Sequence, residues 1–444
     1  SSFTHEVHRC CFISTADLTD LAELPGRVAR LARTAEVEAD TKVRVAEILA
    51  AVRTEGMPAA LRFTETFDGL RLEGADLRVT PSAMAQALTW LERERPALVD
   101  ALRTMLASIR RFAEAQARSL SDITIALPGG GSVGERWVPM ASAGVYIPGG
   151  RAFYPSTLAM TVIPAQVAGV DRIVGVTPPR PGGPDPLILA AAALLGLEEL
   201  ITLGGAQGVA WLAYGEGVDF IAGPGNRFVA EAKRQLVGQV GIDALAGPTE
   251  VLIIADGGAD AARVAEDLLA QAEHDPDAAA VLVSEDGALL SQVEAILRER
   301  VAISPKRADL EASLSRHGLL LHAERELAIA FAEAWAPEHL ELQVRDPEVW
   351  LPHLRAAGAL FIGSSSAEAF GDYGAGPNHV LPTSRSARFS SPLGVASFMK
   401  RQSLLRLSDD DAAAMAPWVE ELATAEGLPH HAASARLRAR HHHA

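Results

Sequence analysis

The chain has few cysteines, a deficit of positive charge and no long apolar run. Its 444 residues include two cysteines, and these are adjacent, Cys10 and Cys11. Adjacent cysteines do not form an ordinary disulfide framework, so a reducing, cytoplasmic compartment is expected. Lys and Arg number 40 against 56 Asp and Glu, and the formal net charge of −16 disfavours nucleic acid and anionic membranes as partners, because both would be repelled. The longest apolar run, 187–197, is too short to cross a bilayer and predicts a buried helix.

The length and composition favour a globular protein of more than one domain. Apolar residues make up 48% of the chain, which is enough for a sizeable core. The first 140 residues are mainly helical in pattern. From Val145 onward, short apolar runs alternate with glycine-rich loops and helical segments, and the runs are 145–147, 172–176, 200–203, 251–255 and 279–284. This alternation predicts an α/β fold with parallel sheets.

A glycine-rich segment matches the spacing of a dinucleotide-binding loop. It reads Gly129-Gly-Gly-Ser-Val-Gly134. The dinucleotide motif requires a helix directly afterwards, but the following Glu-Arg-Trp-Val run ends at Pro139, which prevents one. The segment is therefore interpreted as a hairpin or linker. Two other loops, 148–150 and 223–226, precede helical segments and offer helix N-termini to phosphate groups.

Gln271 and His274 suggest one half of a metal-assisted site. They are three residues apart at the end of a helical run, so both side chains lie on one face and can reach one ion. Asp275 and Pro276 should end the helix there. On its own the motif is weak, because a histidine at a helix C-terminus beside a solvated glutamine explains it equally well.

Glu338 and His339 suggest the second half. They follow Pro337, which fits the first position of a helix, and the first turn of a helix favours a carboxylate. A neighbouring Glu and His can act as an acid/base pair, with the imidazole titrating near neutrality and the carboxylate activating water. The alternative is a charged helix start on the surface.

Two further clusters could complete a metal site. Asp372 and His379 lie in a loop rich in glycine and proline, which allows the backbone to approach a ligand closely. Glu426 and His431 lie on a helical stretch that continues to Arg438. Together Gln, His, Asp and His form a nitrogen and oxygen ligand set that suits zinc and does not exclude manganese or cobalt.

These residues resemble the histidinol dehydrogenase family over nearly the whole length of the chain. The order and spacing of the motifs, each short by itself, are specific to that family. The motifs are Tyr146-Ile-Pro-Gly-Gly-Arg-Ala, Gly204-Gly-Ala-Gln207, Gly223-Pro-Gly-Asn226, Ala246-Gly-Pro-Thr249-Glu, Gln271-Ala-Glu-His274-Asp-Pro-Asp, Ala336-Pro-Glu338-His339-Leu-Glu, Gly371-Asp372-Tyr and Asn378-His379-Val-Leu-Pro-Thr.

The resemblance implies an enzyme that oxidises L-histidinol through L-histidinal to L-histidine with NAD+ and one Zn2+ per subunit. It assigns Glu338 and His339 to acid/base catalysis. The implied metal ligands are Gln271, His274, Asp372 and His431. The implied substrate contacts are Thr249, Gln271, His274, His339, Asp372, His379, Glu426 and His431. The implied NAD contacts are Tyr146, Gln207 and Asn226.

Two positions need comment. Thr249 stands where serine is common in the family, and it keeps the hydroxyl group. His430 competes with His431 for the role of ligand, and the spacing from Glu426 and to Arg438 selects His431.

The resemblance also implies two incomplete Rossmann-like parallel-sheet domains with small N- and C-terminal helical extensions. The expected segments are an N-terminal helical extension (1–38), a first discontinuous domain with the metal and catalytic residues (39–144 and 250–390), a second, NAD-binding domain (145–249) and a C-terminal arm (391–444). The arm is expected to reach the partner's active site in a domain-swapped homodimer, which would bury apolar positions such as Leu422, Leu428 and Leu437. The alternative is a C-terminal helix folded back on its own body.

Two other functions fit part of the pattern. One is a zinc hydrolase in which Glu338 activates a metal-bound water. The glycine-rich half with Tyr146, Gln207 and Asn226 argues against it, since a hydrolase has no need of a dinucleotide site. The other is a dehydrogenase of a related amino or sulfonated alcohol. Retention of His379 and Glu426, with which the family is thought to hold the amino alcohol, argues against that function.

Overall fold

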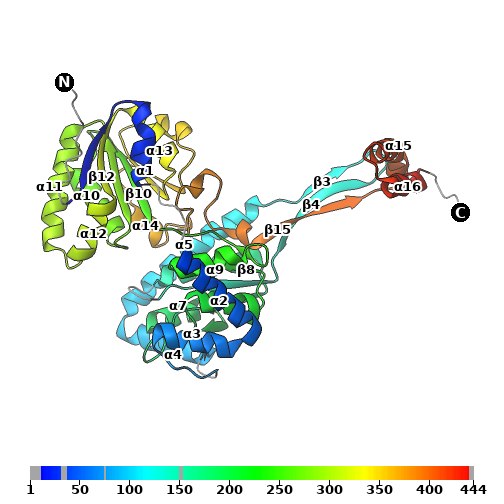
Figure 1. Ribbon diagram of the computed structural model, residues 1–444, viewed down its shortest axis with the longest axis horizontal. Helices are drawn as coiled ribbons and strands as arrows, with labels where there is room; N and C mark the ends of the chain where they lie inside the picture. The colour runs from blue at the N-terminus through cyan, green and yellow to red at the C-terminus, as the bar shows by residue number, and fades with distance from the viewer. Residues whose placement is uncertain (1–11, 32–37, 75–76, 150–153, 440–444) are drawn as a thin grey trace.

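Two α/β units and a projecting arm make up the molecule (Figure 1). The computed structural model describes residues 12–31, 38–74, 77–149 and 154–439. Each unit is built on a six-stranded sheet, and the arm is built on a three-stranded antiparallel sheet. The expected α/β fold with parallel sheets is confirmed. Cys10 and Cys11 lie outside the described residues.

The first unit contains a fully parallel sheet in the order β1-β12-β11-β10-β13-β14. Its strands are β1 (Ser14–Leu18), β10 (Glu250–Ala255), β11 (Ala279–Ser284), β12 (Gly318–Ala323), β13 (His339–Gln343) and β14 (Ala359–Ile362). Its helices are α1 (Leu24–Leu31), α10 (Ala261–Ala272), α11 (Gly287–Ile303), α12 (Arg307–His317), α13 (Arg325–Trp335) and α14 (Glu368–Asp372). Both sheet faces are covered, because alternate residues of β10 join the cluster of α10, α11 and α12 and the cluster of α1 and α13.

The second unit repeats this arrangement with the order β2-β7-β6-β5-β8-β9. Its strands are β2 (Arg78–Val79), β5 (Ser142–Tyr146), β6 (Arg172–Val176), β7 (Glu199–Ile201), β8 (Phe220–Ala222) and β9 (Gly241–Ile242). Its later helices are α6 (Pro155–Ala168), α7 (Pro186–Leu195), α8 (Gly205–Ala210) and α9 (Arg227–Leu236). All pairs are parallel except β2 with β7.

The N-terminal helices belong to the second unit, which corrects the expected domain limits. They are α2 (Ala39–Glu55), α3 (Met57–Asp68), α4 (Pro81–Glu94) and α5 (Pro96–Ser119). Helices α4 and α5 share a core with α6 and α7, whereas α2 and α3 share a core with α8 and α9. Residues 39–119 therefore do not join the first unit, as the segment 39–144 was expected to do. Nor is the segment 1–38 wholly helical, because β1 pairs with β12. An amphipathic pattern shows that a helix is covered, but not by which sheet.

Helix α7 contains most of the longest apolar run. It begins after Asp185, whose carboxylate accepts a hydrogen bond from the N–H of Leu187, and it ends at Gly196, which has φ +66°. The expected buried helix is confirmed, since α7 packs between α4 and α6. Across the described residues, no helix combines the length and apolarity that a bilayer crossing needs.

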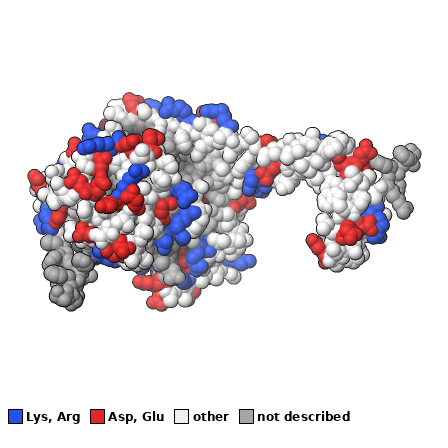
Figure 2. Space-filling model, turned by 90° about the horizontal axis from the view of Figure 1, so that it is seen from above, with Lys and Arg blue, Asp and Glu red and all other residues white. Residues whose placement is uncertain are grey.

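The arm consists of three strands and a terminal helix pair. Its elements are β3 (Ile123–Ala126), β4 (Ser132–Pro139), β15 (Met399–Arg406), α15 (Asp409–Ala425) and α16 (Pro429–Arg438). Strands β3 and β4 form the hairpin that the glycine-rich segment predicted, and β15 pairs antiparallel with β4 over eight residues. The arm therefore includes a hairpin from outside the expected segment 391–444. It extends away from both units, and in the view of Figure 2 charged side chains gather near its base and at its tip, with mostly uncharged surface between them (Figures 1 and 2).

Candidate active site

The candidate acid/base pair lies at the amino edge of the first sheet. Helix α13 ends at Trp335, Ala336 adopts a left-handed conformation with φ +50°, and β13 begins at His339. The predicted helix start at Pro337 is therefore wrong, and Pro337 instead follows the end of a helix. The reason is tertiary, because β13 pairs with β10 and places His339 opposite Val251.

Glu338 is buried and held by hydrogen bonds from the start of β10. The hydroxyl of Thr249 donates to Glu338 Oε2 at 2.6 Å, and the backbone N–H of Glu250 donates to the same oxygen at 3.0 Å. Burial raises the pKa of Glu338, while His339 and these two hydrogen bonds oppose the rise. A carboxylate with a raised pKa is a stronger base than an exposed one, which suits it to take a proton from water.

His339 has a fixed orientation. Its Nδ1 lies 2.9 Å from the backbone carbonyl oxygen of Glu250. A carbonyl can only accept, so Nδ1 carries the hydrogen and Nε2 of the neutral ring is left as an acceptor. Glu338 Oε2 and Glu368 Oε1 lie 3.6 and 3.8 Å from Nδ1.

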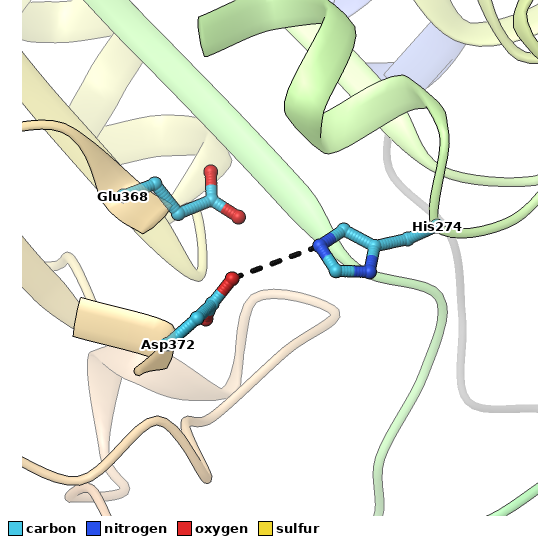
Figure 3. A group of neighbouring side chains, drawn as sticks. All are labelled: His274, Glu368 and Asp372. Atoms are coloured by element: carbon cyan, nitrogen blue, oxygen red, sulfur yellow. Dashed lines mark ion pairs between the residues drawn. The ribbon is translucent and has the colours of Figure 1, made fainter. Parts of the chain in front are cut away.

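A group of metal-ligating side chains lies beside this pair. His274, just beyond the end of α10, points toward Glu368 and Asp372 of α14 (Figure 3). One donor atom of each residue lies within 4.8 Å of the others, and His274 Nε2 is 3.7 Å from Asp372 Oδ2. The structure thus brings the sequence-predicted His274 and Asp372 together. It also adds Glu368, which sequence reasoning missed although it lies four residues before Asp372 on the same helix.

This donor group fits a divalent metal ion. Gln271 is fully buried on α10, and its Nε2 has no hydrogen-bond partner among the described residues. Oε2 of Glu368, also buried, is likewise unpartnered there. Buried polar atoms are rarely left without a partner, and a cation would satisfy the Glu368 oxygen, whereas Gln271 could bind the same cation only through its amide oxygen.

The charges of the group are coupled. The hydrogen bond to Asp372 raises the pKa of His274. Burial opposes ionisation of Asp372, but the hydrogen bond from His274 and the nearby imidazoles lower its pKa overall. Burial raises the pKa of Glu368 well above its usual range. A bound cation would favour the charged carboxylates and would replace the proton shared between His274 and Asp372.

A pocket of about 360 Å³ opens onto these residues and is lined by His339, Asp372 and His379. His379 also joins the two units, since its Nε2 lies 3.3 Å from Thr157 Oγ1 of α6. Its Nδ1 lies 3.0 Å from the backbone carbonyl of Asp372, and burial lowers its pKa, so the ring is neutral. The predicted substrate residues Thr249 and His379 are therefore both near the acid/base pair.

The predicted NAD residues gather at the carboxyl edge of the second sheet. Tyr146 ends β5, and its hydroxyl oxygen accepts a hydrogen bond from the N–H of Gly205 at 2.9 Å. Gln207 is buried at the start of α8, and Asn226 caps the N-terminus of α9 through its side chain. This edge, with its helix N-termini, is where doubly wound sheets bind dinucleotides. Gly150 and the three residues after it lie outside the described part of the chain.

A buried ion pair supports the same edge. Lys233 of α9 and Asp243 are 2% and 3% exposed and form an ion pair. The Lys233 ammonium donates to the carbonyl oxygen of Gly223 at 3.0 Å, and Asp243 Oδ2 accepts from the N–H of Gly223 at 2.8 Å. A Cβ atom at Gly223 would lie 2.2 Å from the carbonyl oxygen of Tyr146, so only glycine fits. Sequence reasoning missed the pair, because charged residues on an amphipathic helix usually face solvent.

The last two predicted site residues are not part of this group. Glu426 ends α15 and His431 lies in α16, and both are exposed at the far end of the arm (Figure 1). The arm does not fold back on its own body, which excludes the alternative considered from the sequence. Within one chain, the predicted set of four metal ligands is therefore incomplete.

Comparisons with known proteins agree with the geometry. The family model for histidinol dehydrogenase matches residues 31–439. Over 416 residues the chain is 46% identical to a histidinol dehydrogenase of Aromatoleum aromaticum, covering 92% of this chain and 94% of that protein. Over 432 residues it is 44% identical to one of Synechococcus sp., covering 95% and 98%. The crystal structure of histidinol dehydrogenase from Elizabethkingia anophelis has a TM-score of 0.89 and 31% identity, covering 98% of this chain and 99% of that one. The chain belongs to the histidinol dehydrogenase family.

Proposed function

We propose that the protein oxidises L-histidinol through L-histidinal to L-histidine, with zinc in the His274 group and NAD+ at the carboxyl edge of the second sheet. The observation that carries the proposal is that His339 and Asp372 line one pocket, with the buried Glu338 next to His339 and the donor His274 next to Asp372. The bound ion would hold the substrate, and NAD+ would accept a hydride in each oxidation.

His339 would perform the proton transfer of the first oxidation. Its Nε2 takes the hydroxyl proton of the alcohol while the carbon gives up a hydride, so that a carbonyl forms. The bond from Nδ1 to the Glu250 carbonyl keeps Nε2 available as the base. The carboxyl groups of Glu338 and Glu368 lie 3.6 and 3.8 Å from Nδ1 of the same ring.

Glu338 would act in the second oxidation. The aldehyde must first add water, and the attacking water must lose a proton to a base. Burial raises the pKa of Glu338, and the hydrogen bonds from Thr249 and the Glu250 backbone fix its position for this step. Adjacent residues thus divide two proton transfers in one pocket, which requires close positioning of both groups.

A second copy of the chain would complete the site. The exposed end of the arm carries Glu426 and His431, the predicted substrate contact and fourth ligand. Apolar side chains on the same arm are also exposed: Ile123, Ile125, Leu404, Leu405, Trp418, Leu422, Leu428 and Leu437. Such a surface favours burial against another subunit, and exchange of identical arms gives a twofold dimer.

The direct test is to add L-histidinol and NAD+ to the zinc-loaded protein and to follow NADH absorbance. We expect two NADH for each histidinol consumed. Absence of NADH would contradict the proposal, and NADH at one per histidinol would contradict its second oxidation. The hydrolase alternative has lost its support, since the chain belongs to a dehydrogenase family. Substitution of a related amino alcohol for histidinol in the same assay tests the remaining alternative.

A further inference from the structure

The glycine-rich turn between β3 and β4 binds a carboxylate of the chain itself. The N–H groups of Gly129 and Gly131 donate to Oδ1 and Oδ2 of Asp411, both at 2.7 Å. Asp411 lies in the first turn of α15, about 280 residues later in the sequence. The turn that matched a dinucleotide loop by spacing therefore holds an anion, and that anion is an aspartate side chain.

The three glycines are required by this contact. A Cβ atom at Gly129 would lie 2.6 Å from Asp411 Oδ1. One at Gly131 would lie 2.4 Å from Asp411 Oδ2 and 2.5 Å from the carbonyl oxygen of Arg406. Gly130 has φ +94°, a conformation that residues with side chains rarely adopt. The three glycines thus allow the turn to lie close to both the Asp411 carboxylate and the end of β15.

Asp411 also fixes the start of α15. The N–H of Asp411 donates to the hydroxyl oxygen of Ser408 at 3.0 Å, and the N–H of Ser408 donates to Asp411 Oδ2 at 3.4 Å. This reciprocal pair is a capping box. One carboxylate therefore connects the β3–β4 turn, the N-cap residue Ser408 and the first turn of α15, and it is 5% exposed although the surrounding arm is open to solvent.

Little else holds the helix pair to the strands. The buried residues of α15 and α16 are Asp411, Ala416, Ala423 and Ala432. No described residue from 400 to 439 belongs to a hydrophobic core cluster of the two units. Helices α15 and α16 pack on each other, and apart from Asp411 the residues they bury are small alanines. The direction of the two helices relative to the strands therefore depends strongly on the hydrogen bonds of Asp411.

We propose that Asp411, clasped by Gly129 and Gly131, is a positioning residue for the active site of the partner chain. It holds the α15–α16 pair in the direction in which Glu426 and His431 enter that site. This inference rests on the proposed function in one respect, namely that the arm crosses to a second copy. The local part, that Asp411 fixes the helix pair on the hairpin, stands without it.

The local part can be tested by hydrogen exchange on Asp411→Asn. The amide keeps the size of the side chain but replaces one acceptor oxygen with an NH2 group, which cannot accept from a glycine N–H. We expect faster exchange at 127–131 and 408–439 and unchanged exchange in both units. Asp409→Asn, an exposed neighbour in the same helix turn, is the matched control. Unchanged exchange in the arm would overturn the proposal.

A second variant guards against loss of folding. Gly131→Ala leaves the carboxylate in place but directs a methyl group at it, so it should give the same regional change in exchange. Both variants should lose about tenfold to a hundredfold in kcat/KM, the scale of a displacement of about 1 Å. Circular dichroism and native mass should remain those of the wild type. Full activity with increased exchange would reject the positioning role.

Mixing tests whether the effect is exerted on the partner. Asp411→Asn protein is combined, under conditions of subunit exchange, with Glu338→Gln protein, which is impaired in the second oxidation, and formation of histidine is measured. In a heterodimer, the Asp411→Asn body receives an intact arm, so that one of the two sites regains activity. Each heterodimer should therefore have about half of the wild-type activity, and an equimolar, fully exchanged mixture about a quarter. No recovery despite confirmed exchange would overturn the proposal. If the wild type itself produces no NADH from histidinol, the proposed function fails, while the hydrogen-exchange result still decides the role of Asp411 in the arm.

Discussion

The two α/β units have the same strand order but use opposite edges of their sheets. The strands β10, β11, β12, β13 and β14 of the first sheet occupy the same places as β5, β6, β7, β8 and β9 of the second. Each sheet has one further, N-terminal strand, which is β1 beside β12 in the first sheet and β2 beside β7 in the second. In the second unit the predicted NAD residues follow the carboxyl ends of the strands, where doubly wound folds usually bind ligands. In the first unit Thr249 and Glu338 precede the amino ends of β10 and β13.

Helix polarity explains the difference. At the carboxyl edge of the second sheet lie the N-termini of α6, α8 and α9, whose positive dipole ends favour phosphate. At the amino edge of the first sheet, α10 and α13 end next to Gln271 and Trp335. Helix C-termini carry negative dipole ends, which together with Glu368 and Asp372 favour a cation. Equivalent folds can therefore favour an anion at one edge of the sheet and a cation at the opposite edge.

The largest effect is expected from His274→Asn. Loss of one metal ligand should weaken zinc binding by more than about a hundredfold, because loss of an outer-shell partner alone can reach that range. Circular dichroism and NAD+ binding should be retained, since the ion does not organise the second sheet. Metal analysis after dialysis decides the outcome. His322→Asn, an exposed histidine at the opposite edge of the same sheet, is the control. Stoichiometric zinc in the His274 variant would show that the amino edge is not the metal site.

Glu338→Gln should separate the two oxidations. The amide cannot take a proton from water, so oxidation of histidinal should fall by about 10² to 10⁴. Oxidation of histidinol should fall less, because His339 keeps its bond to the Glu250 carbonyl. Single-turnover measurements with each substrate provide the comparison. Equal loss in both steps would contradict the division of roles between the two residues.

Lys233→Met tests the other edge. The change leaves the buried Asp243 without its ion-pair partner and releases the carbonyl of Gly223, so NAD+ affinity should fall about tenfold and stability by about 3 kcal/mol. Zinc content should remain unchanged. Calorimetric titration with NAD+ is the measurement, and Lys400→Met, at an exposed lysine of β15, is the control. A loss of stability without a loss of affinity would show that the ion pair is structural only.

The sequence predicted the strands and helices of both sheets well, because buried parallel strands and helix starts leave local signals. The strands at 172–176 and 279–284 have the predicted limits, and a helix, α9, follows the loop 223–226 as predicted. The start of β13 was misread, since proline after a helix and proline at the start of one look alike in sequence. Only pairing with β10 distinguishes the two.

The site was predictable where its residues form short motifs and not where tertiary contacts create it. Gln271, His274, Glu338 and His339 lie in such motifs. The sequence did not point to Glu368, Lys233 or Asp243, because residues of these types usually lie on the surface. Burial, which the sequence does not show, leaves a Glu368 oxygen without a partner and pairs Lys233 with Asp243. The domain limits failed for a related reason, because the apolar faces of α2 to α5 fit a helical layer on either sheet.

The smallest effect concerns the buried charges of the two units. In the second unit Lys233 and Asp243 neutralise each other, whereas in the first unit Glu341 and Asp267 share a hydrogen bond without a cation. Burial, with a contribution from Asp267, raises the pKa of Glu341 to about 8 from a usual 4.5. Between about pH 4.5 and about pH 8 the folded chain therefore keeps a proton that the unfolded chain has lost. The free energy of unfolding should decrease as the pH rises through this range and level off above it.

In Glu341→Gln, whose amide can still bond Asp267, the decrease in the free energy of unfolding between about pH 5 and about pH 8 should be smaller by about 1 to 3 kcal/mol. Denaturant unfolding at several pH values measures it, with the exposed Glu299→Gln as control. Equal pH dependence in wild type and Glu341→Gln would show that the first unit does not keep this proton.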